Sequence, residues 1–218
     1  MDFEEVFNKE RATRKFSTRK VDDELIKEII KKAQQSPSLL NSQPWRAYAI
    51  TGGALLKLKR ENKAYIARKA PVSEDFSTML SIDWSTFPSQ NMSNMGAFVT
   101  YFLHNKTELF ENANNNMFYA PAIIFLTIPK KSPAWSVFDL GIFAQSIMLL
   151  AINRGLDTMP AHSLVAYPDL IRKYTNIPDD EAIGMAIAIG YADKAAEVNS
   201  PTYIPGRVPF DKIFKLIK

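Results

Sequence analysis

Residues 36–46 read Ser-Pro-Ser-Leu-Leu-Asn-Ser-Gln-Pro-Trp-Arg, and this stretch determines how the rest of the chain is interpreted. An amphipathic pattern precedes it and the strand-like run 46–51 follows it, which predicts a loop between a helix and a strand. Two prolines stiffen this loop, and its Ser, Asn and Gln side chains supply hydrogen-bonding groups beside the indole of Trp45. The mixture suits a flat, polar aromatic ligand, but a plain connector whose Trp45 anchors it in the core explains the segment equally well.

The N-terminal stretch 9–16, Lys-Glu-Arg-Ala-Thr-Arg-Lys-Phe, is the second informative segment. Arg11 and Arg14 lie three residues apart, so their guanidinium groups can converge on one helical turn or at its exit. Two converging guanidiniums favour an anion, and their planar fork matches phosphate. The alternative is a solvated basic face. Acidic residues among these bases, such as Glu10, argue against a nucleic-acid-binding arm.

Composition restricts the chemistry that the chain can perform unaided. The 218 residues include two His and no Cys, which excludes disulfides and thiol nucleophiles and makes a metal site improbable. Neither a nucleophile-elbow Gly-x-Ser-x-Gly, a P-loop nor a Gly-x-Gly-x-x-Gly motif is present. Such a chain is typical of an enzyme whose chemistry comes from a cofactor.

The same composition also limits the class of protein and its location in the cell. The chain is 46% hydrophobic and 23% charged with a net charge of +4, which is ordinary for a folded soluble protein. No apolar run reaches the roughly 18–20 residues that span a bilayer, and the first residues show no signal peptide. We expect a cytoplasmic protein that binds neither membrane nor nucleic acid.

Periodicity and turn residues outline the elements. A helix is expected from Asp22 to the Ser36-Pro37 pair, and residues 112–116 are expected to be a turn. The segment 71–97 is too aromatic for a disordered linker and predicts a folded excursion or lid. The other expected helices cover 3–9, 54–67, 97–110, 136–154 and 168–174, and the strands cover 46–51, 121–129 and 182–191.

The expected helix 136–154 is apolar on nearly every face. A helix of that kind must be enclosed on all sides, which is difficult within one small domain. A partner subunit is the natural remedy, so the sequence favours a homodimer.

Four motifs in order resemble the nitroreductase family of FMN-dependent oxidoreductases. They are the basic N-terminal segment, Pro37-Ser-Leu-Leu-Asn-Ser-Gln-Pro-Trp45, Gly155-Leu-Asp-Thr-Met-Pro160 and Pro205-Gly-Arg-Val-Pro209. The third motif looks like the turn that follows the long central helix in the family, so the resemblance implies a turn at 155–160. The resemblance implies an α+β fold: a three-layer α/β/α sandwich with a central, mostly antiparallel sheet, a long central helix and a domain-swapped C-terminal arm. It implies one FMN-binding domain over 1–218, with 71–118 as a variable excursion and 194–218 as the arm.

The resemblance also assigns the site residues. Arg11, Arg14 and Arg207 would bind the FMN phosphate and ribityl end, with Ala12 contributing its backbone and Thr13 a possible hydroxyl. Residues 160–163 would place backbone donors near the reactive edge of the flavin, and His162 is a weak candidate for proton transfer. The loop of the other subunit would line the ring through Pro37, Ser38, Leu39 and Asn41, and Gln43 would either join them or hold the loop itself.

The implied reaction has two halves: NADH or NADPH delivers a hydride to the flavin, and a small electron-poor acceptor such as a nitroaromatic or quinone then receives it. Neither a nucleophilic side chain nor a metal is required. The chain departs from the family pattern at Glu10, Ala12 and Leu39. These departures leave open a flavin-binding carrier or sensor, or a drifted family member without NAD(P)H turnover.

Overall fold

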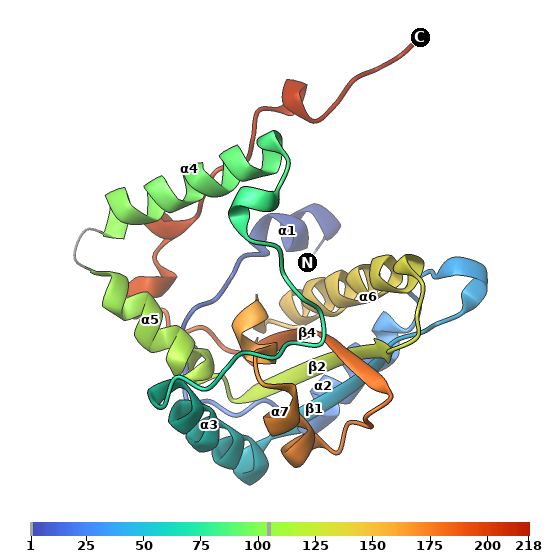
Figure 1. The fold of residues 1–218 in the computed structure, drawn as a ribbon, viewed down its shortest axis with the longest axis vertical. Coiled ribbons are helices and arrows are strands. Elements are labelled where there is room, and N and C mark those ends of the chain that lie inside the picture. Colours follow the sequence, from blue (N-terminus) through green and yellow to red (C-terminus); the bar gives the residue numbers. More distant parts are fainter. Residues whose placement is uncertain (1, 104–105) are drawn as a thin grey trace.

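A four-stranded antiparallel sheet forms the centre of the protein. The computed structural model describes residues 2–103 and 106–218, and in it the strand order is β1-β2-β4-β3 with every neighbouring pair antiparallel (Figure 1). The strands are β1 (Arg46–Thr51), β2 (Ala122–Pro129), β3 (Asp157–Pro160) and β4 (Glu181–Gly190). The predicted α+β class with a mostly antiparallel sheet is therefore confirmed.

Both faces of this sheet are apolar, because the side chains of its central strand β2 alternate between two cores. Ile123 and Phe125 pack into one cluster, whereas Ile124 and Leu126 pack into the other. An irregularity in the β2–β4 register lies between Leu126 and Thr127. A sheet that is buried on both faces requires a layer of helices on each side.

Those layers are present and produce the predicted sandwich. Helices α2 (Asp23–Ala33) and α6 (Ala134–Asn153) cover one face, where Ile26, Ile29 and Phe143 are buried. The other face is covered by α3 (Gly52–Ala67), α5 (Thr107–Asn115) and α7 (Pro168–Thr175), with Leu58 and Ile171 in its core.

Local signals set the helix ends as expected. The Asp22 carboxylate accepts a hydrogen bond from the N–H of Glu24 and caps α2. Gly155 ends α6 with a φ of +77°, a conformation that glycine adopts without the cost of a Cβ atom. The short helix α1 (Phe3–Lys9) also has its predicted bounds.

Helix α6 is only half enclosed by its own chain. One side packs on the sheet, while Trp135, Val137 and Phe138 remain 57%, 47% and 59% exposed. By length and composition it is the one helix, within the described ranges, that passes as a membrane span, and half of its most apolar window is buried. Core helices of soluble proteins pass the same test.

The region 86–115 contains the clearest errors of the sequence prediction. Instead of one helix over 97–110 and a turn at 112–116, the chain forms α4 (Thr86–Leu103) and α5. The Asn-rich stretch is helical because Ala113 is buried in the core, and such tertiary contacts outweigh turn propensity. Pro88, in the first turn of α4, was an unused signal for a helix start. Whether α4 acts as a lid stays a prediction.

The predicted turn at 155–160 was wrong in its second half. Residues Asp157–Pro160 form β3, whose Thr158 lies opposite Ile189 of β4. The strand is short, lies at the sheet edge and ends in proline, so it has no recognisable alternation. Beyond β4 the chain runs past α4, and its C-terminus points away from the body (Figure 1).

Candidate functional site

The N-terminal basic segment lies along the outer side of β3. The N–H of Thr13 donates to the carbonyl of Thr158 at 2.9 Å, and Ala12 forms a parallel bridge with the same residue. Thr13 is buried, so its backbone and side chain are fixed in the fold. This pairing places Arg11 and Arg14 on either side of an anchored dipeptide.

Asn199 holds the other side of this segment. Its Oδ1 accepts hydrogen bonds from the N–H groups of Arg14 and Lys15 at 2.8 and 3.1 Å, and its Nδ2 donates to the carbonyl of Lys15 at 2.6 Å and that of Asp193 at 3.0 Å. Sequence reasoning missed Asn199, which lies about 185 residues away and carries no motif.

Both arginine side chains lack an acidic partner among the described residues. Arg14 is half-buried, with its guanidinium carbon 5.3 Å from the centroid of the Phe110 ring, and burial lowers the pKa of Arg14. Arg11 is exposed and lines a cavity of about 560 Å³ together with Lys194, Asp157 and Glu197. Because an unpaired cation loses hydration on burial, the half-buried Arg14 favours a bound anion.

Strand β3 leads directly into residues 160–163. The N–H of Ala161 donates to the carbonyl of Ala186 at 3.2 Å, and Pro160 has no N–H. The N–H groups of His162 and Ser163 donate to none of the residues that the structure describes. Of the four predicted residues, these two therefore offer backbone donors to a ligand.

The side chains of His162 and Ser163 face the excursion. The hydroxyl of Ser163 donates to Oδ1 of Asn114 at 2.6 Å. Nε2 of the half-exposed His162 lies 3.9 Å from Oε1 of Glu74. Within the described ranges, no group of three or more His, Asp or Glu side chains is placed to hold a metal ion.

The segment around Glu74 is itself fastened to the core. Asp75 accepts hydrogen bonds from the N–H of Ile183 at 2.8 Å and from Arg172 at 2.7 Å. The Phe76 ring fills the space over Gly184, where a Cβ atom would lie 2.7 Å from the ring. These contacts fix the base of the excursion beside residues 160–163, and the sequence analysis did not foresee them.

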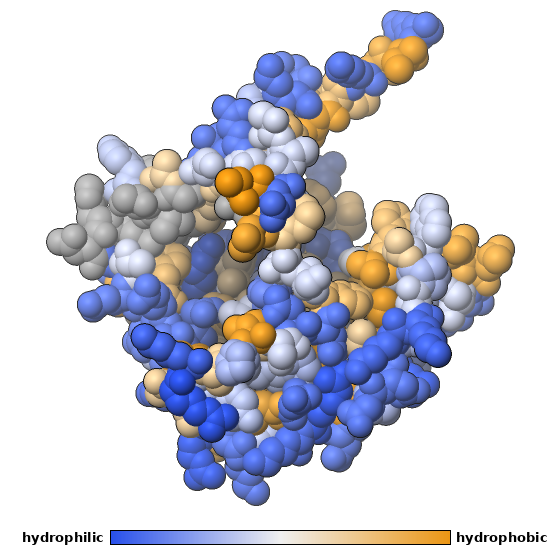
Figure 2. All heavy atoms as spheres, viewed as in Figure 1, coloured by the Kyte–Doolittle hydropathy of each residue, from blue (hydrophilic) through white to orange (hydrophobic). Residues whose placement is uncertain are grey.

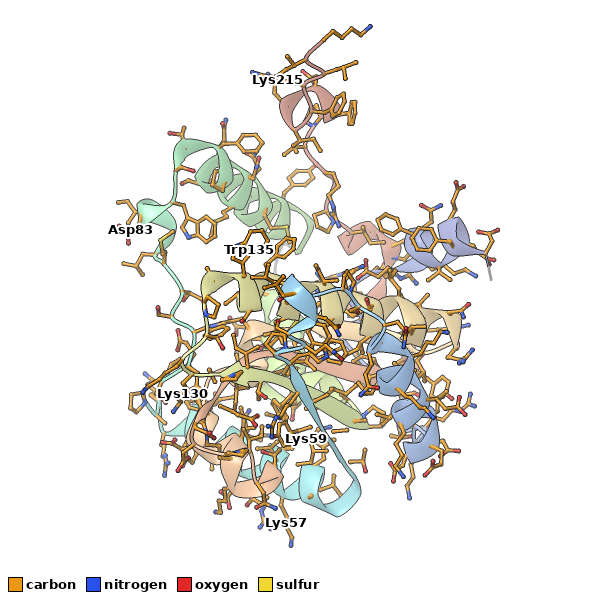
Figure 3. The ribbon with its side chains drawn as sticks, turned by 90° about the vertical axis from the view of Figure 1, so that its right-hand side faces the viewer. Lys57, Lys59, Asp83, Lys130, Trp135 and Lys215 are labelled. Atoms are coloured by element: carbon orange, nitrogen blue, oxygen red, sulfur yellow. The ribbon has the colours of Figure 1, made fainter. Side chains whose placement is uncertain are left out.

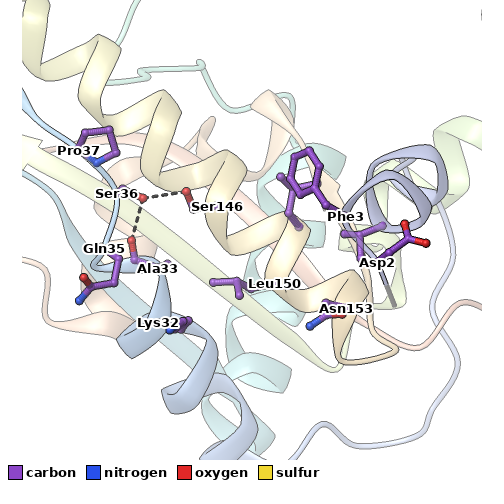
Figure 4. A pocket seen from close by; sticks show the side chains of 12 residues that line it. Asp2, Phe3, Lys32, Ala33, Gln35, Ser36, Pro37, Ser146, Leu150 and Asn153 are labelled. Atoms are coloured by element: carbon purple, nitrogen blue, oxygen red, sulfur yellow. Dashed lines mark hydrogen bonds between the residues drawn. The ribbon is translucent and has the colours of Figure 1, made fainter.

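The loop 36–43 is tied to α6. The Ser36 hydroxyl donates to that of Ser146 at 2.8 Å (Figure 4), and the N–H of Leu39 donates to Oδ2 of Asp139 at 3.2 Å. Asp139 is buried, and it is the only charged residue of the largely apolar helix α6. A lone charge in such a helix was a signal for a partner that sequence reasoning passed over.

Internal hydrogen bonds shape the rest of the loop. The N–H of Gln43 donates to Oγ of Ser38 at 2.9 Å, and its side-chain amide donates to Oδ1 of Asn41 at 3.0 Å. Leu40, Asn41 and Gln43 have φ values of +50°, +58° and +44°. Such strained residues cluster at ligand sites, where the surrounding contacts hold them in place.

Trp45 serves as the core anchor of the loop. It is buried and stacks on Phe143 of α6 with ring centroids 4.8 Å apart and planes at 9°. The connector reading is thus right for Trp45 itself. The side chain of Leu40, in contrast, is 94% exposed, so this part of the loop packs on nothing in its own chain.

The departures from the family pattern have local explanations. Glu10 accepts a hydrogen bond from the side chain of Gln145 at 3.3 Å and so ties the end of α1 to α6. Ala12 needs only its backbone for the bridge to Thr158, and Leu39 uses its N–H to reach Asp139.

Within one chain the predicted site residues form two groups and a separate arginine. Residues 11–14 and 160–163 are joined through β3, whereas the loop 36–43 is bonded to α6. Arg207 donates to the carbonyls of Pro205 and Gly206 and lines a cavity of about 610 Å³ against α4. The surface is hollowed between α4 and the body of the protein (Figure 2).

A scan of known families matches residues 9–191 to the Nitroreductase family. Among curated proteins, the chain is 32% identical to a 4-nitrobenzoate reductase of Pseudomonas putida, covering 91% of this chain and 89% of that one. It is 28% identical to a chloronitrobenzene nitroreductase of Comamonas testosteroni, covering 87% and 86%.

Solved structures match the fold over the whole length. The FMN and NADPH-dependent nitroreductase NfnB of a Sphigopyxis strain superposes with a TM-score of 0.86 at 25% identity, covering 100% of both chains. NfnB of Mycobacterium smegmatis, solved in complex with NADPH, gives a TM-score of 0.88 at 24% identity, covering 99% of this chain and 97% of that one.

Proposed function

The chain belongs to the nitroreductase family, and from that premise we propose that it is an FMN-dependent oxidoreductase that reduces nitroaromatic compounds with NADPH or NADH. FMN, held by Arg11, Arg14 and the N–H groups of His162 and Ser163, would supply the hydride-transfer chemistry between the nicotinamide and the acceptor. The similar reductases of nitrobenzoate and chloronitrobenzene support a nitroaromatic acceptor. They do not favour a carrier or sensor without turnover.

One observation carries the assignment of the site. The pairing of residues 12–13 with Thr158 anchors the segment that carries Arg11 and Arg14 along β3, and the N–H groups of His162 and Ser163, which donate to none of the described residues, follow the end of that strand. Three strand residues, from Thr158 to Ala161, span about 10 Å. An anion binder and a pair of backbone donors at this separation suit the phosphate and the ring of FMN.

The backbone donors have a defined task in this scheme. An N–H group aimed at the flavin stabilises the negative charge that the ring gains on reduction, and this is the main electronic influence available to the protein. The imidazole of His162 lies near Glu74, not beside the N–H groups of His162 and Ser163. Proton transfer by His162 therefore stays a prediction.

A second subunit completes the proposed site. The loop residues Pro37, Ser38, Leu39, Asn41 and Gln43 would line the flavin of the partner, because their own chain bonds them to α6 and leaves Leu40 exposed. The exposed apolar residues of α6 would lie in the same interface. Arg207 would reach a phosphate through the C-terminal arm, because its guanidinium hydrogen-bonds, among the described residues, only to the adjacent carbonyls of Pro205 and Gly206.

The physiological setting belongs to the proposal as well. NADPH is the donor to test first, because the Sphigopyxis relative depends on it. We expect the enzyme to work in the cytoplasm, where reduced nicotinamides are available. A quinone acceptor stays a prediction of the family resemblance.

The deciding experiment is a visible absorption spectrum of the freshly purified protein, followed by chromatography of the heat-released chromophore. We expect a two-band flavin spectrum, release of FMN, and NADPH oxidation that depends on added 4-nitrobenzoate or nitrobenzene. A colourless protein that also fails to take up added FMN would contradict the site. A yellow protein that oxidises NADPH with neither acceptor would contradict the nitroaromatic substrate alone.

A further inference from the structure

Lys59 lines another cavity, which the proposed reaction does not use. The cavity measures about 810 Å³ and lies between α2, α3 and the segment before β2. Lys59 and its neighbour Lys57 are found at the α3 end of the protein, far from Trp135 at the start of α6 (Figure 3). The apolar wall consists mainly of Leu55, Leu56 and Pro121.

The Lys59 side chain is held without a counterion. Its Nζ donates a hydrogen bond to the carbonyl of Ala120 at 2.5 Å, and it forms no ion pair with the described residues. Burial of this amine lowers the pKa of Lys59 to about 8. Lys57, which lies on a different side of the same helix, is exposed to solvent.

The acidic residues that line the same cavity are each engaged elsewhere. Asp22 caps its own helix, and Asp23 accepts a hydrogen bond from the Thr51 hydroxyl at 3.3 Å. Glu24 pairs with Lys27 at 2.6 Å. The remaining titratable groups that line the cavity are Lys20 and Tyr119. No carboxylate is therefore committed to keeping Lys59 protonated.

This environment makes Lys59 a nucleophile near neutral pH. Because burial lowers the pKa of Lys59 to about 8, its amine is unprotonated far more often near neutral pH than the amine of a solvent-exposed lysine. A neutral amine keeps an N–H to donate to Ala120, and its lone pair is left for an electrophile that enters the cavity.

We propose that Lys59 is an acylation site for small acyl thioesters. The Nζ lone pair attacks the carbonyl carbon, a C–N bond forms, and the C–S bond breaks with release of the thiolate. The amine proton goes to solvent, so the products are an amide and a thiol, with no net oxidation. The surrounding carboxylates and apolar wall favour a small, uncharged acyl group.

The test is acetylation of the purified, folded holoprotein by the acetyl thioester of N-acetylcysteamine, followed at each lysine by peptide mass spectrometry. We expect Lys59 to react at least about tenfold faster than Lys57 at pH 7.5, because its larger unprotonated fraction outweighs its lower basicity and access. The rate at Lys59 should level off above pH 8. Equal rates at the two lysines would overturn the proposal.

A second variant separates reactivity from simple access. Leu56 is 68% exposed and lines the cavity three residues before Lys59, so Leu56→Glu places a carboxylate beside the amine without disturbing the core. We expect acetylation of Lys59 to slow several-fold, since a nearby negative charge favours the protonated amine. Leu56→Gln is the uncharged control. An equal rate in both variants would contradict the proposed basis of reactivity.

Discussion

Two half-buried cations, Arg14 beside β3 and Lys59 beside β2, present the same physical problem with different outcomes. Neither has a carboxylate partner among the described residues, and burial lowers the pKa of both. A guanidinium nevertheless keeps its proton at any physiological pH, whereas a desolvated amine can lose it. Arg14 therefore needs an anion to offset its lost hydration, and Lys59 does not.

The comparison separates a ligand site from a reactive side chain. A permanent, unpaired charge implies that something of opposite charge binds beside it, and the phosphate of FMN meets that need at Arg14. A group that can become neutral implies only that its proton is labile. Each substitution below changes either the proposed phosphate site around Arg14 or the proton on Lys59.

The largest effect is expected for Arg14→Met, which keeps the aliphatic packing on Phe110 but removes the charge. Loss of one charge-assisted hydrogen-bonding group is worth about 1.5–3 kcal/mol, so FMN affinity should fall about a hundredfold. Fluorescence titration of the apoprotein with FMN measures it. The matched control is Arg19→Met, whose guanidinium stacks 3.7 Å from the Tyr191 ring, and it should bind FMN like wild type. Equal losses in both variants would contradict the phosphate role of Arg14.

Arg207→Ala tests whether a cation that bonds only to its own backbone serves the same phosphate. We expect FMN binding to weaken by about tenfold to a hundredfold, for the same reason as at Arg14. Because the guanidinium hydrogen-bonds, among the described residues, only to the carbonyls of Pro205 and Gly206, the apoprotein should keep its unfolding midpoint. Retention of flavin through extensive dialysis, as in wild type, would show that the arm does not reach the site.

Asn199→Ala removes the hydrogen bonds that position Arg14 without removing its charge. The N–H groups of Arg14 and Lys15 lose their shared acceptor, which costs about 1–3 kcal/mol of unfolding free energy in a half-buried setting. We expect FMN affinity to fall about tenfold, less than for Arg14→Met. Urea unfolding and FMN titration measure the two effects. A stability loss with unchanged affinity would limit Asn199 to a structural role.

The sequence predicted well what depends on local pattern. Strand 46–51 and the buried run before Pro129 followed from alternation and from a continuous apolar stretch, and the Asp22 cap and Gly155 stop followed from terminal residues. The arginines and the loop residues came from motifs that resemble a family. These features occupy a few neighbouring residues, so a single chain displays them.

What the sequence could not provide are the contacts between distant segments. The pairing of Thr13 with Thr158 depends on β3, a strand too short to show a period. Asn199 is one of many polar residues in a tail without pattern, and only the fold places it on Arg14. Asp139 is the exception, because a carboxylate in an apolar helix could have been flagged in advance.

The smallest effect concerns the proton on Lys59 and has a definite sign. Its pKa is about 8 in the folded chain and higher, near 10.5, when unfolded, so between these values the unfolded chain binds more protons. The unfolding free energy of wild type therefore increases as the pH rises through this window, and below pH 8 the buried charge lowers it by a constant amount.

Lys59→Met removes this buried charge and should raise the unfolding free energy at pH 7 by at most about 1 kcal/mol, allowing for solvent screening of the partly exposed amine. The advantage over wild type should shrink by pH 9.5, and Lys57→Met, at an exposed lysine of the same helix, is the control. An advantage of Lys59→Met that is the same at pH 7 and 9.5 would show that Lys59 keeps its proton, and the contrast with Arg14 would then fail.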